Sequence, residues 1–441
     1  MNNSRLLYGI FFLFLIKLFA ILFTDFNLFG DESQYWLWSQ KLDLGYYSKP
    51  PLMAWFIAIF TKIFGNSFLV LKLIPSFIYF FVALALYNLT RNIGLKKKDA
   101  LSCILLFLFI PVVSFSSFFL STDIFLVLFW TLSLNELYKI TKRPKSINFI
   151  LLGIMLGLAF LSKYAAVYFI VCLILYVLLD KNIRSIISNN YYNVLIFFVC
   201  MLIIILPNLI WNINNEWVTF QHTEDNANFE NININLFRGI IFLIIQIIMV
   251  GPVLFIISFL NYKKIKFNSN HKFLLFFSLP IFIIVFIEAI IVRANANWAA
   301  PALISFYLLL FLFVDNIKSI YFKINLWFNF GFCIIFFAVI GLSLPLSIFE
   351  RINGINQYAQ SILYKAKSSN ITNFVISDRM LFASLSYELR DYDLQFYMPH
   401  IEGDEITNHF KMSSPLKKDM SYNFILIGFP DEINYLDKDF N

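Results

Sequence analysis

The sequence predicts an all-α polytopic membrane protein that carries a small α/β domain at its C-terminal end. Composition is the first reason, because 60% of the 441 residues are hydrophobic and only 14% are charged. The second is the recurrence of apolar runs of roughly 17–25 residues, the length that a helix needs to cross a bilayer. The third is a fall in hydrophobicity after residue 345. A soluble globule is excluded, and the net charge of +7 does not indicate nucleic-acid binding.

The apolar runs predict about eleven transmembrane helices. We expect them at residues 6–23, 68–90, 101–118, 123–140, 148–162, 164–180, 192–211, 237–260, 273–291, 298–314 and 324–345. Lysine and arginine gather in alternate loops, whereas residues 212–236 contain neither and carry acidic residues instead. Basic loops stay in the cytoplasm. The N-terminus is therefore expected inside and, because the number of spans is odd, the C-terminal segment outside.

The predicted domain boundary follows the last apolar run. Residues 1–345 form the transmembrane domain, and residues 346–441 form a small soluble domain on the periplasmic side. Within the latter, residues 371–378 and 422–428 have the pattern of strands and residues 379–390 that of a short helix. The four cysteines lie in apolar runs and the histidines lack metal-ligand spacing. The sequence thus predicts no metal site and no cofactor, and it leaves a dependence on a divalent metal open.

The segment between the first two spans, residues 24–67, is too apolar for a free loop. Asp31 is placed to cap a helix that starts at Glu32, on which aromatic residues share one face. A pair of prolines ends this element, and a second apolar helix is expected over residues 52–64. Tryptophan and tyrosine favour the membrane interface, so amphipathic helices lying at that interface are expected. The plainest interpretation of this segment is an interfacial anchor and nothing more.

Polar residues outside the basic loops gather on the outer side of the predicted membrane. Asp31 and Glu32 open the first outer loop, and Asp123 lies in the turn before the fourth span. Lys49 and Lys163 add cations on the same side. Charges at a membrane boundary are costly unless they are paired or used, so this convergence indicates a site at the outer surface. The structural alternatives are a helix cap for Asp31, a helix N-terminal acid for Asp123 and a headgroup contact for Lys163.

Five motifs occur in order along the chain. They are GDESQYWLWSQ…GYYSKPPL at 30–52, STD at 121–123, SKY at 162–164, PNLIWN…WVTFQH at 207–222 and ANWAAPA at 296–302. Together they resemble the bacterial members of the protein-mannosyltransferase and lipid A aminoarabinose-transferase superfamily. The resemblance implies a GT-C-like membrane fold and an inverting glycosyltransferase that takes a sugar from a polyprenyl-phosphate donor. The implied acceptor is lipid A, another envelope glycan or a protein, at the periplasmic face of the bacterial inner membrane.

The same resemblance implies roles for individual residues. Asp31 matches an essential acid of the first outer loop, with Glu32 beside it, and Asp123 matches a second acid; these are the predicted catalytic residues. Lys49, before the proline pair, matches a contact to lipid phosphate, and Lys163 and Arg293 are further cations for the departing phosphate. The residues predicted to bind the substrates are Tyr46, Tyr47, Trp217, Gln221, His222, Asn297 and Trp298.

A lipid or sugar transporter or flippase is the alternative function. Such folds often have inverted halves and ionisable residues near the middle of the membrane. Here the polar residues gather at one face and no duplicated half is evident in the sequence, which favours the enzyme.

Overall fold

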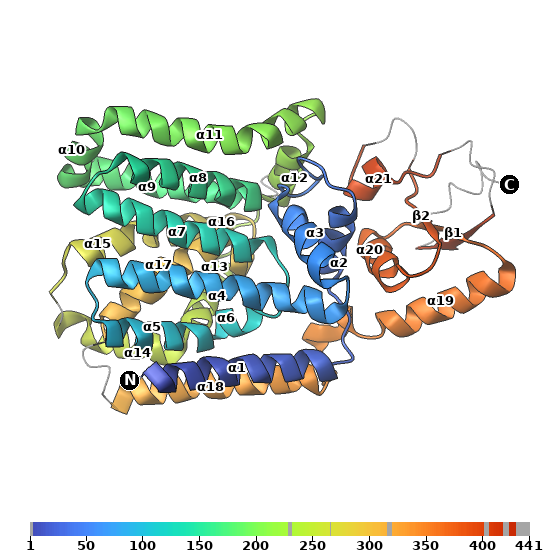
Figure 1. Cartoon of the computed structure of the whole chain (residues 1–441), viewed down its shortest axis with the longest axis horizontal. Coiled ribbons are helices and arrows are strands. Elements are labelled where there is room, and N and C mark those ends of the chain that lie inside the picture. The colour runs from blue at the N-terminus through green and yellow to red at the C-terminus, as the bar shows by residue number, and fades with distance from the viewer. Residues whose placement is uncertain are drawn as a thin grey trace.

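The computed structural model describes residues 3–227, 232–264, 266–314, 320–400, 405–417 and 423–428. Most of it is a bundle of helices that run along a common direction (Figure 1). The N-terminus lies at one end of this bundle, and the C-terminal elements lie beyond the other end (Figure 1). The bundle consists of α1 (Asn3–Phe23), α4 (Phe68–Ile93), α5 (Lys97–Phe109), α6 (Pro111–Ser116), α7 (Thr122–Lys142), α8 (Ser146–Ser162), α9 (Val167–Leu179), α11 (Tyr191–Asn214), α13 (Leu236–Val250), α14 (Pro252–Asn261), α15 (Ser269–Phe276), α16 (Leu279–Ile291), α17 (Ala300–Leu312) and α18 (Ile320–Gly341).

The multi-pass, all-α membrane architecture is confirmed. Among the described residues, five helical stretches are long and apolar enough to cross a bilayer, or up to seven if each of two bent helix pairs is one span. Four shorter apolar helices accompany them, over Tyr8–Phe23, Leu52–Phe64, Ser146–Ser162 and Ala296–Leu312. Each of the eleven predicted spans coincides with a helix or a pair of helices. Several of these helices are shorter than a full bilayer crossing, because a turn or a proline divides the span.

The predicted span at 237–260 is broken. It consists of α13 and α14, which meet at a bend of 94°. Gly251 lies between them with φ of +106°, a conformation that costs glycine little, and Pro252 begins α14 without an N–H to continue the preceding helix. The span at 101–118 is divided in the same way, because Pro111 starts α6. Each of these two predicted spans therefore consists of two helices.

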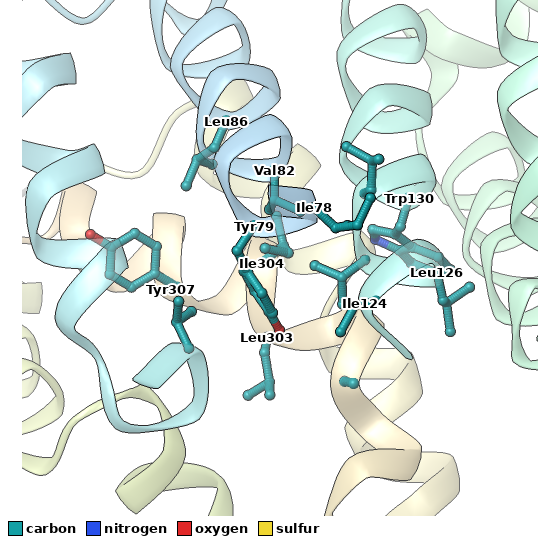
Figure 2. Close-up of a cluster of buried hydrophobic side chains, with 14 of the residues drawn as sticks. Ile78, Tyr79, Val82, Leu86, Ile124, Leu126, Trp130, Leu303, Ile304 and Tyr307 are labelled. Carbon is teal, nitrogen blue, oxygen red and sulfur yellow. The ribbon is translucent and has the colours of Figure 1, made fainter. Parts of the chain in front are cut away.

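The centre of the bundle is a continuous apolar core between α4, α7 and α17 (Figure 2). Figure 2 shows buried side chains that these three helices contribute to the core: Ile78, Tyr79, Val82, Leu86, Ile124, Leu126, Trp130, Leu303, Ile304 and Tyr307. The phenol of Tyr307 donates to the carbonyl of Cys103 at 2.6 Å, which satisfies the one polar atom of this side chain. The packed core holds the start of α7 in a defined place, and a predicted catalytic acid lies there.

Helices α8 and α11 approach each other unusually closely. Gly153 and Gly157 form a GxxxG pattern on α8, and a Cβ at Gly153 would lie only 2.4 Å from the carbonyl oxygen of Phe197 on α11. Small residues spaced by four let two membrane helices come into backbone contact. This contact fixes the end of α8, where Lys163 lies, against the end of α11.

The remaining elements occupy loops and the end of the bundle beside the C-terminal segment. They are α2 (Gly30–Gln40), α3 (Leu52–Phe64), α10 (Lys181–Asn189), α12 (Val218–Ala227), and the 3-10 helices η1 (Tyr164–Ala166), η2 (Tyr262–Lys264) and η3 (Ala296–Ala299). The two helices predicted for the first outer loop are thus present as α2 and α3. In Figure 1 both lie between the bundle and the C-terminal elements.

The C-terminal segment contains a small parallel sheet and confirms the predicted α/β character. Its elements are η4 (Ser347–Ile352), α19 (Ile355–Ser369), β1 (Asn373–Ile376), α20 (Arg379–Glu388), β2 (Gln395–Tyr397), α21 (His409–Ser413) and β3 (Phe424–Ile427), with strand order β2-β1-β3. It has an apolar core of its own, built around Phe374, Phe382 and Phe410. The domain boundary at 345 stays a prediction. Tyr422, in the second predicted strand, lies outside the described residues, as do 401–404, 418–421 and 429–441.

Candidate active site

A polar cluster forms where three segments meet at the end of the bundle. Asp123 lies in the first turn of α7, Lys163 follows the last residue of α8, and Asn297 lies in η3. Lys163 Nζ is 2.7 Å from Asp123 Oδ1, and Asn297 Nδ2 donates to Asp123 Oδ2 at 2.8 Å. Three residues predicted separately for the site are thus in direct contact. Because both oxygens of Asp123 are engaged by donors, its position favours an organising role over that of a free base.

Asp31 has the most accessible carboxylate of the three predicted catalytic acids. Its side chain is 39% exposed, and within the described ranges its one ionic contact is with Arg379, whose Nη1 lies 3.8 Å from Oδ1. The residue lies in the first turn of α2. Phe29 precedes the helix as its N-cap, so the expectation that Asp31 caps α2 is wrong. A partly exposed, loosely held carboxylate keeps room to accept a proton from an incoming hydroxyl group.

Glu32, in contrast, is buried and fully engaged. Its carboxylate lies 2.6 Å from Nζ of Lys72, an α4 residue that is also buried. It further accepts the backbone N–H of Phe29 at 2.8 Å and that of Leu120 at 2.7 Å. These contacts join α2 to α4 and to the turn before α7. The geometry favours a structural role for Glu32 in place of the predicted catalytic one.

Substitution Glu32→Gln should therefore lower stability rather than act on chemistry alone. It leaves the ammonium of Lys72 buried without a counter-charge, a change that typically costs about 3–5 kcal/mol. The measurement is thermal unfolding of the purified protein in detergent. The double variant Glu32→Gln/Lys72→Met should regain most of the loss, because no unpaired charge then remains.

The control is Glu350→Gln, because Glu350 is exposed on η4 and should tolerate the change. If Glu32→Gln melts like the native protein yet transfers no sugar, Glu32 belongs to the catalytic groups after all.

Lys49 lies in the tight loop between α2 and α3. The N–H of Tyr46 donates to the carbonyl of Lys49 at 3.1 Å, which closes the loop, and Pro50 and Pro51 follow. In the part of the chain that the structure describes, the ammonium makes no hydrogen bond or ion pair. Burial, and then the positive charge of Lys163, lower the pKa of Lys49 to about 8. An unpaired ammonium beside other charged groups is suited to an anionic ligand.

The two tyrosines predicted to bind the substrates have different surroundings. Tyr46 is fully buried: it stacks on Trp38 with ring centroids 4.6 Å apart, and its hydroxyl donates to the carbonyl of Trp38 at 3.0 Å. The geometry favours a structural role for Tyr46. Tyr47 instead lies against His222 of α12, with ring centroids 5.0 Å apart. Burial, and then the charges of Lys49 and Arg379, lower the pKa of His222 to about 4, so this imidazole is neutral near pH 7.

Four of the predicted residues make no hydrogen bond, ion pair or ring contact with the cluster among the described residues. Trp217 is exposed and packs edge-on against Phe220, and Gln221 donates to the carbonyl of Glu216. Arg293 is exposed after the end of α16, and Trp298 packs against the apolar core. The roles of these four residues in substrate or phosphate binding stay predictions. Of the predicted residues near η3 that the structure describes, Asn297 hydrogen-bonds to Asp123, whereas Arg293 and Trp298 do not.

Sequence reasoning missed Arg379 and Tyr35. Arg379 begins α20, more than 300 residues after Asp31. Tyr35 is one helical turn from Asp31; burial, and then the charges of Asp31 and Asp123, raise its pKa well above the usual value. The spacing of Asp31 and Tyr35 on one helix face could have indicated the second of these. Nothing local to residue 379 could have indicated the first.

Two cavities of about 520 and 530 Å³ lie where α2 and the loops next to it meet the C-terminal segment. Neither is lined by Asp31, Lys49 or Asp123. Within the described residues, no group of three or more histidine, cysteine, aspartate or glutamate side chains could hold a metal ion.

The fold and the cluster define a class: a multi-pass α-helical membrane protein with a charged site at one end of its bundle, beside a small α/β unit. Residues 48–211 match the family described as dolichyl-phosphate-mannose-protein mannosyltransferase. Over 287 residues, the chain is 34% identical to the lipid A galacturonosyltransferase RgtD of Rhizobium johnstonii. That alignment covers 64% of this chain and 59% of the relative.

Solved structures extend the similarity to nearly the whole chain. ArnT from Cupriavidus metallidurans in the apo state has a TM-score of 0.68 at 12% identity, covering 99% of this chain and 95% of that one. The same enzyme bound to undecaprenyl phosphate has the same score at 13% identity and equal coverage. The apo oligosaccharyltransferase of Archaeoglobus fulgidus has a TM-score of 0.51 at 13% identity, covering 88% and 64%. At such identities, these structures show a shared fold.

These matches confirm the resemblance to the protein-mannosyltransferase and ArnT superfamily, and with it the GT-C-type membrane fold.

Proposed function

We propose that the protein is a glycosyltransferase that moves a sugar from a polyprenyl-phosphate donor to an acceptor in the bacterial envelope. The observation that carries the proposal is the charged cluster at the end of the bundle. It brings two carboxylates, Asp31 and Asp123, together with three cations, Lys49, Lys163 and Arg379. Three positive against two negative charges leave one positive charge, which complements a donor phosphodiester carrying one negative charge.

The chemistry follows from these groups. The acceptor hydroxyl attacks the anomeric carbon from the face opposite the phosphate, so the new bond forms with inversion. The bond between that carbon and the phosphate oxygen breaks, and the phosphate leaves with both bonding electrons. Asp31 accepts the proton of the hydroxyl group. Lys49, assisted by Lys163, stabilises the negative charge that the phosphate gains as it departs, which is the step where preorganised cations contribute most.

The substrates are inferred from the relatives. The ArnT structure with undecaprenyl phosphate supports a polyprenyl carrier for the donor. The name of the galacturonosyltransferase relative supports lipid A as the acceptor, with another envelope glycan or a protein as the alternatives. A carrier that is itself a membrane lipid fits a site at the end of a membrane bundle, where a phosphate at the interface meets Lys49.

The proposed location is the inner membrane, with the site and residues 346–441 in the periplasm. The distribution of basic loops supports this orientation. Asp225→Cys on α12 should react with a membrane-impermeant thiol reagent added outside spheroplasts. Lys97→Cys, at the start of α5 beside a basic loop, should react only after the membrane is opened. The reverse pattern at these two exposed positions would overturn the orientation.

Transfer of radiolabelled sugar from polyprenyl-phosphate donors by the purified protein is the direct test. One observation fits the alternative of a flippase, because the break at Gly251 gives one span the discontinuous form common in transporters. The assay therefore includes lipid translocation in proteoliposomes. Translocation without transfer from any of several donors would replace the proposed activity by the alternative.

A further inference from the structure

The C-terminal segment is docked closely on α2. Gly30 opens α2, and a Cβ there would lie 2.7 Å from the sulfur of Met380 on α20. The ring of Tyr387 packs edge-on against Trp36, with centroids 5.0 Å apart, and its hydroxyl donates to the carbonyl of Asn66 at 3.2 Å. These contacts place the first turn of α20 directly beside the first turn of α2, where Asp31 lies.

Arg379 occupies an unusual position for a cation. Asp378 is the N-cap of α20 and accepts the N–H of Leu381 at 2.7 Å, so Arg379 is the first residue of the helix. Positive charge is unfavourable at a helix N-terminus, because the unpaired N–H groups there already carry partial positive charge. The helix itself therefore gives no reason for an arginine at this place.

The contacts of Arg379 with α2 explain why an arginine stands at this position. Arg379 Nη1 donates to Gln34 Oε1 at 3.0 Å and lies 3.8 Å from Asp31 Oδ1. Asp31 and Gln34 are three residues apart on one helix face, so a single guanidinium group spans both. Gln34 is buried and supplies the firm anchor, while the longer contact leaves the carboxylate of Asp31 accessible.

We propose that Arg379 is the positioning residue for Asp31, and that the C-terminal segment completes the active site by supplying it. The proposal rests on the glycosyltransferase function proposed above. Arg379 holds the carboxylate toward the acceptor hydroxyl. The groups around Asp31 are Tyr35, Lys49 and Arg379.

The test compares three variants of the purified full chain. Arg379→Met keeps the aliphatic stem and removes the charge. Arg379→Lys keeps the charge but loses the planar guanidinium group that reaches two acceptors at once. Arg351→Ala, which removes an exposed arginine of η4, is the control. Arg379→Met should lower kcat by about tenfold to a hundredfold, the scale expected when a catalytic group is misplaced. KM for the donor should change little, and Arg379→Lys should recover part of the loss.

The comparison of kcat, KM and melting temperature separates positioning from a structural role. A misplaced Asp31 lowers kcat and leaves the melting temperature native, whereas loss of a structural contact lowers the melting temperature. Melting temperatures should match the native protein for all three variants. If Arg379→Met is destabilised, Arg379→Lys still decides the question, because a positioning role predicts that kcat of this variant falls while its melting temperature stays native.

Two results would overturn the proposal. One is native kcat in Arg379→Met; the other is a loss confined to KM for the donor, which would make Arg379 a phosphate contact instead. Absence of transfer by the native protein would reject the proposed function, not the role of Arg379 relative to Asp31, so the two failures are distinguishable.

Discussion

Asp31→Asn is expected to abolish sugar transfer while leaving the protein folded. The substitution is nearly isosteric and removes only the charge and the basicity of the carboxylate. Loss of proton transfer from the acceptor hydroxyl should lower the rate by at least about a hundredfold. The contact with Arg379 at 3.8 Å is long and partly exposed, so its loss should cost less than about 1 kcal/mol of stability.

The measurement is initial-rate transfer of labelled sugar, paired with the melting temperature of each variant. Asp43→Asn is the matched control, because Asp43 lies exposed between α2 and α3 and, among the described residues, its carboxylate accepts only the N–H of Leu44. Near-native transfer by Asp31→Asn would move the role of general base to Asp123. The carboxylate of Asp123 would then have to release Lys163 or Asn297 in order to bind the acceptor hydroxyl.

Lys49→Ala is expected to reduce transfer by at least about a hundredfold, the scale for one lost preorganised electrostatic contact. The lipid phosphodiester becomes a phosphate monoester on departure and gains about one negative charge. A cation that meets this charge stabilises the transition state more than the ground state, so turnover should fall as well as binding. Two prolines after Lys49 stiffen the backbone that presents it. Lys49→Arg should recover part of the loss, because the charge is kept while the geometry changes.

Lys62→Ala, at the exposed end of α3, is the control for removing a lysine near the interface. Rates are compared at limiting and at saturating donor. Near-native transfer by Lys49→Ala under both conditions would transfer the phosphate role to Lys163 or Arg293.

The same residue predicts a pH dependence. Burial lowers the pKa of Lys49 to about 8, so the ammonium is mostly protonated at pH 7 and is lost as pH rises through that value. The kcat/KM for the donor, which reports the free enzyme, should therefore fall above about pH 8. In Lys49→Arg the fall should move to higher pH, because guanidinium stays charged. A basic limb at the same pH in both proteins would exclude Lys49 as its source.

The sequence by itself was sufficient to predict the fold class and most residues of the charged cluster at the end of the bundle. Spans could be predicted because the bilayer acts on each segment separately. An apolar run long enough to cross it as a helix can be recognised without reference to the rest of the chain. The same holds for the segment between the first two spans, whose aromatic residues and prolines indicated α2 and α3. Asp123, Lys163 and Asn297 were all predicted for one side of the membrane, and topology alone was enough for that.

Tertiary structure decided which of these charges are free and which are already paired. Glu32 and Asp31 are neighbours in sequence with equal chemistry, yet packing places Glu32 on the buried Lys72 and leaves Asp31 beside Arg379. A charge near a membrane is stabilised by whichever partner the fold brings within a few ångströms. Such partners lie 40 and more than 300 residues away along the chain. Hydrophobicity is a local property of a segment, whereas the pairing of charges is a property of the folded whole.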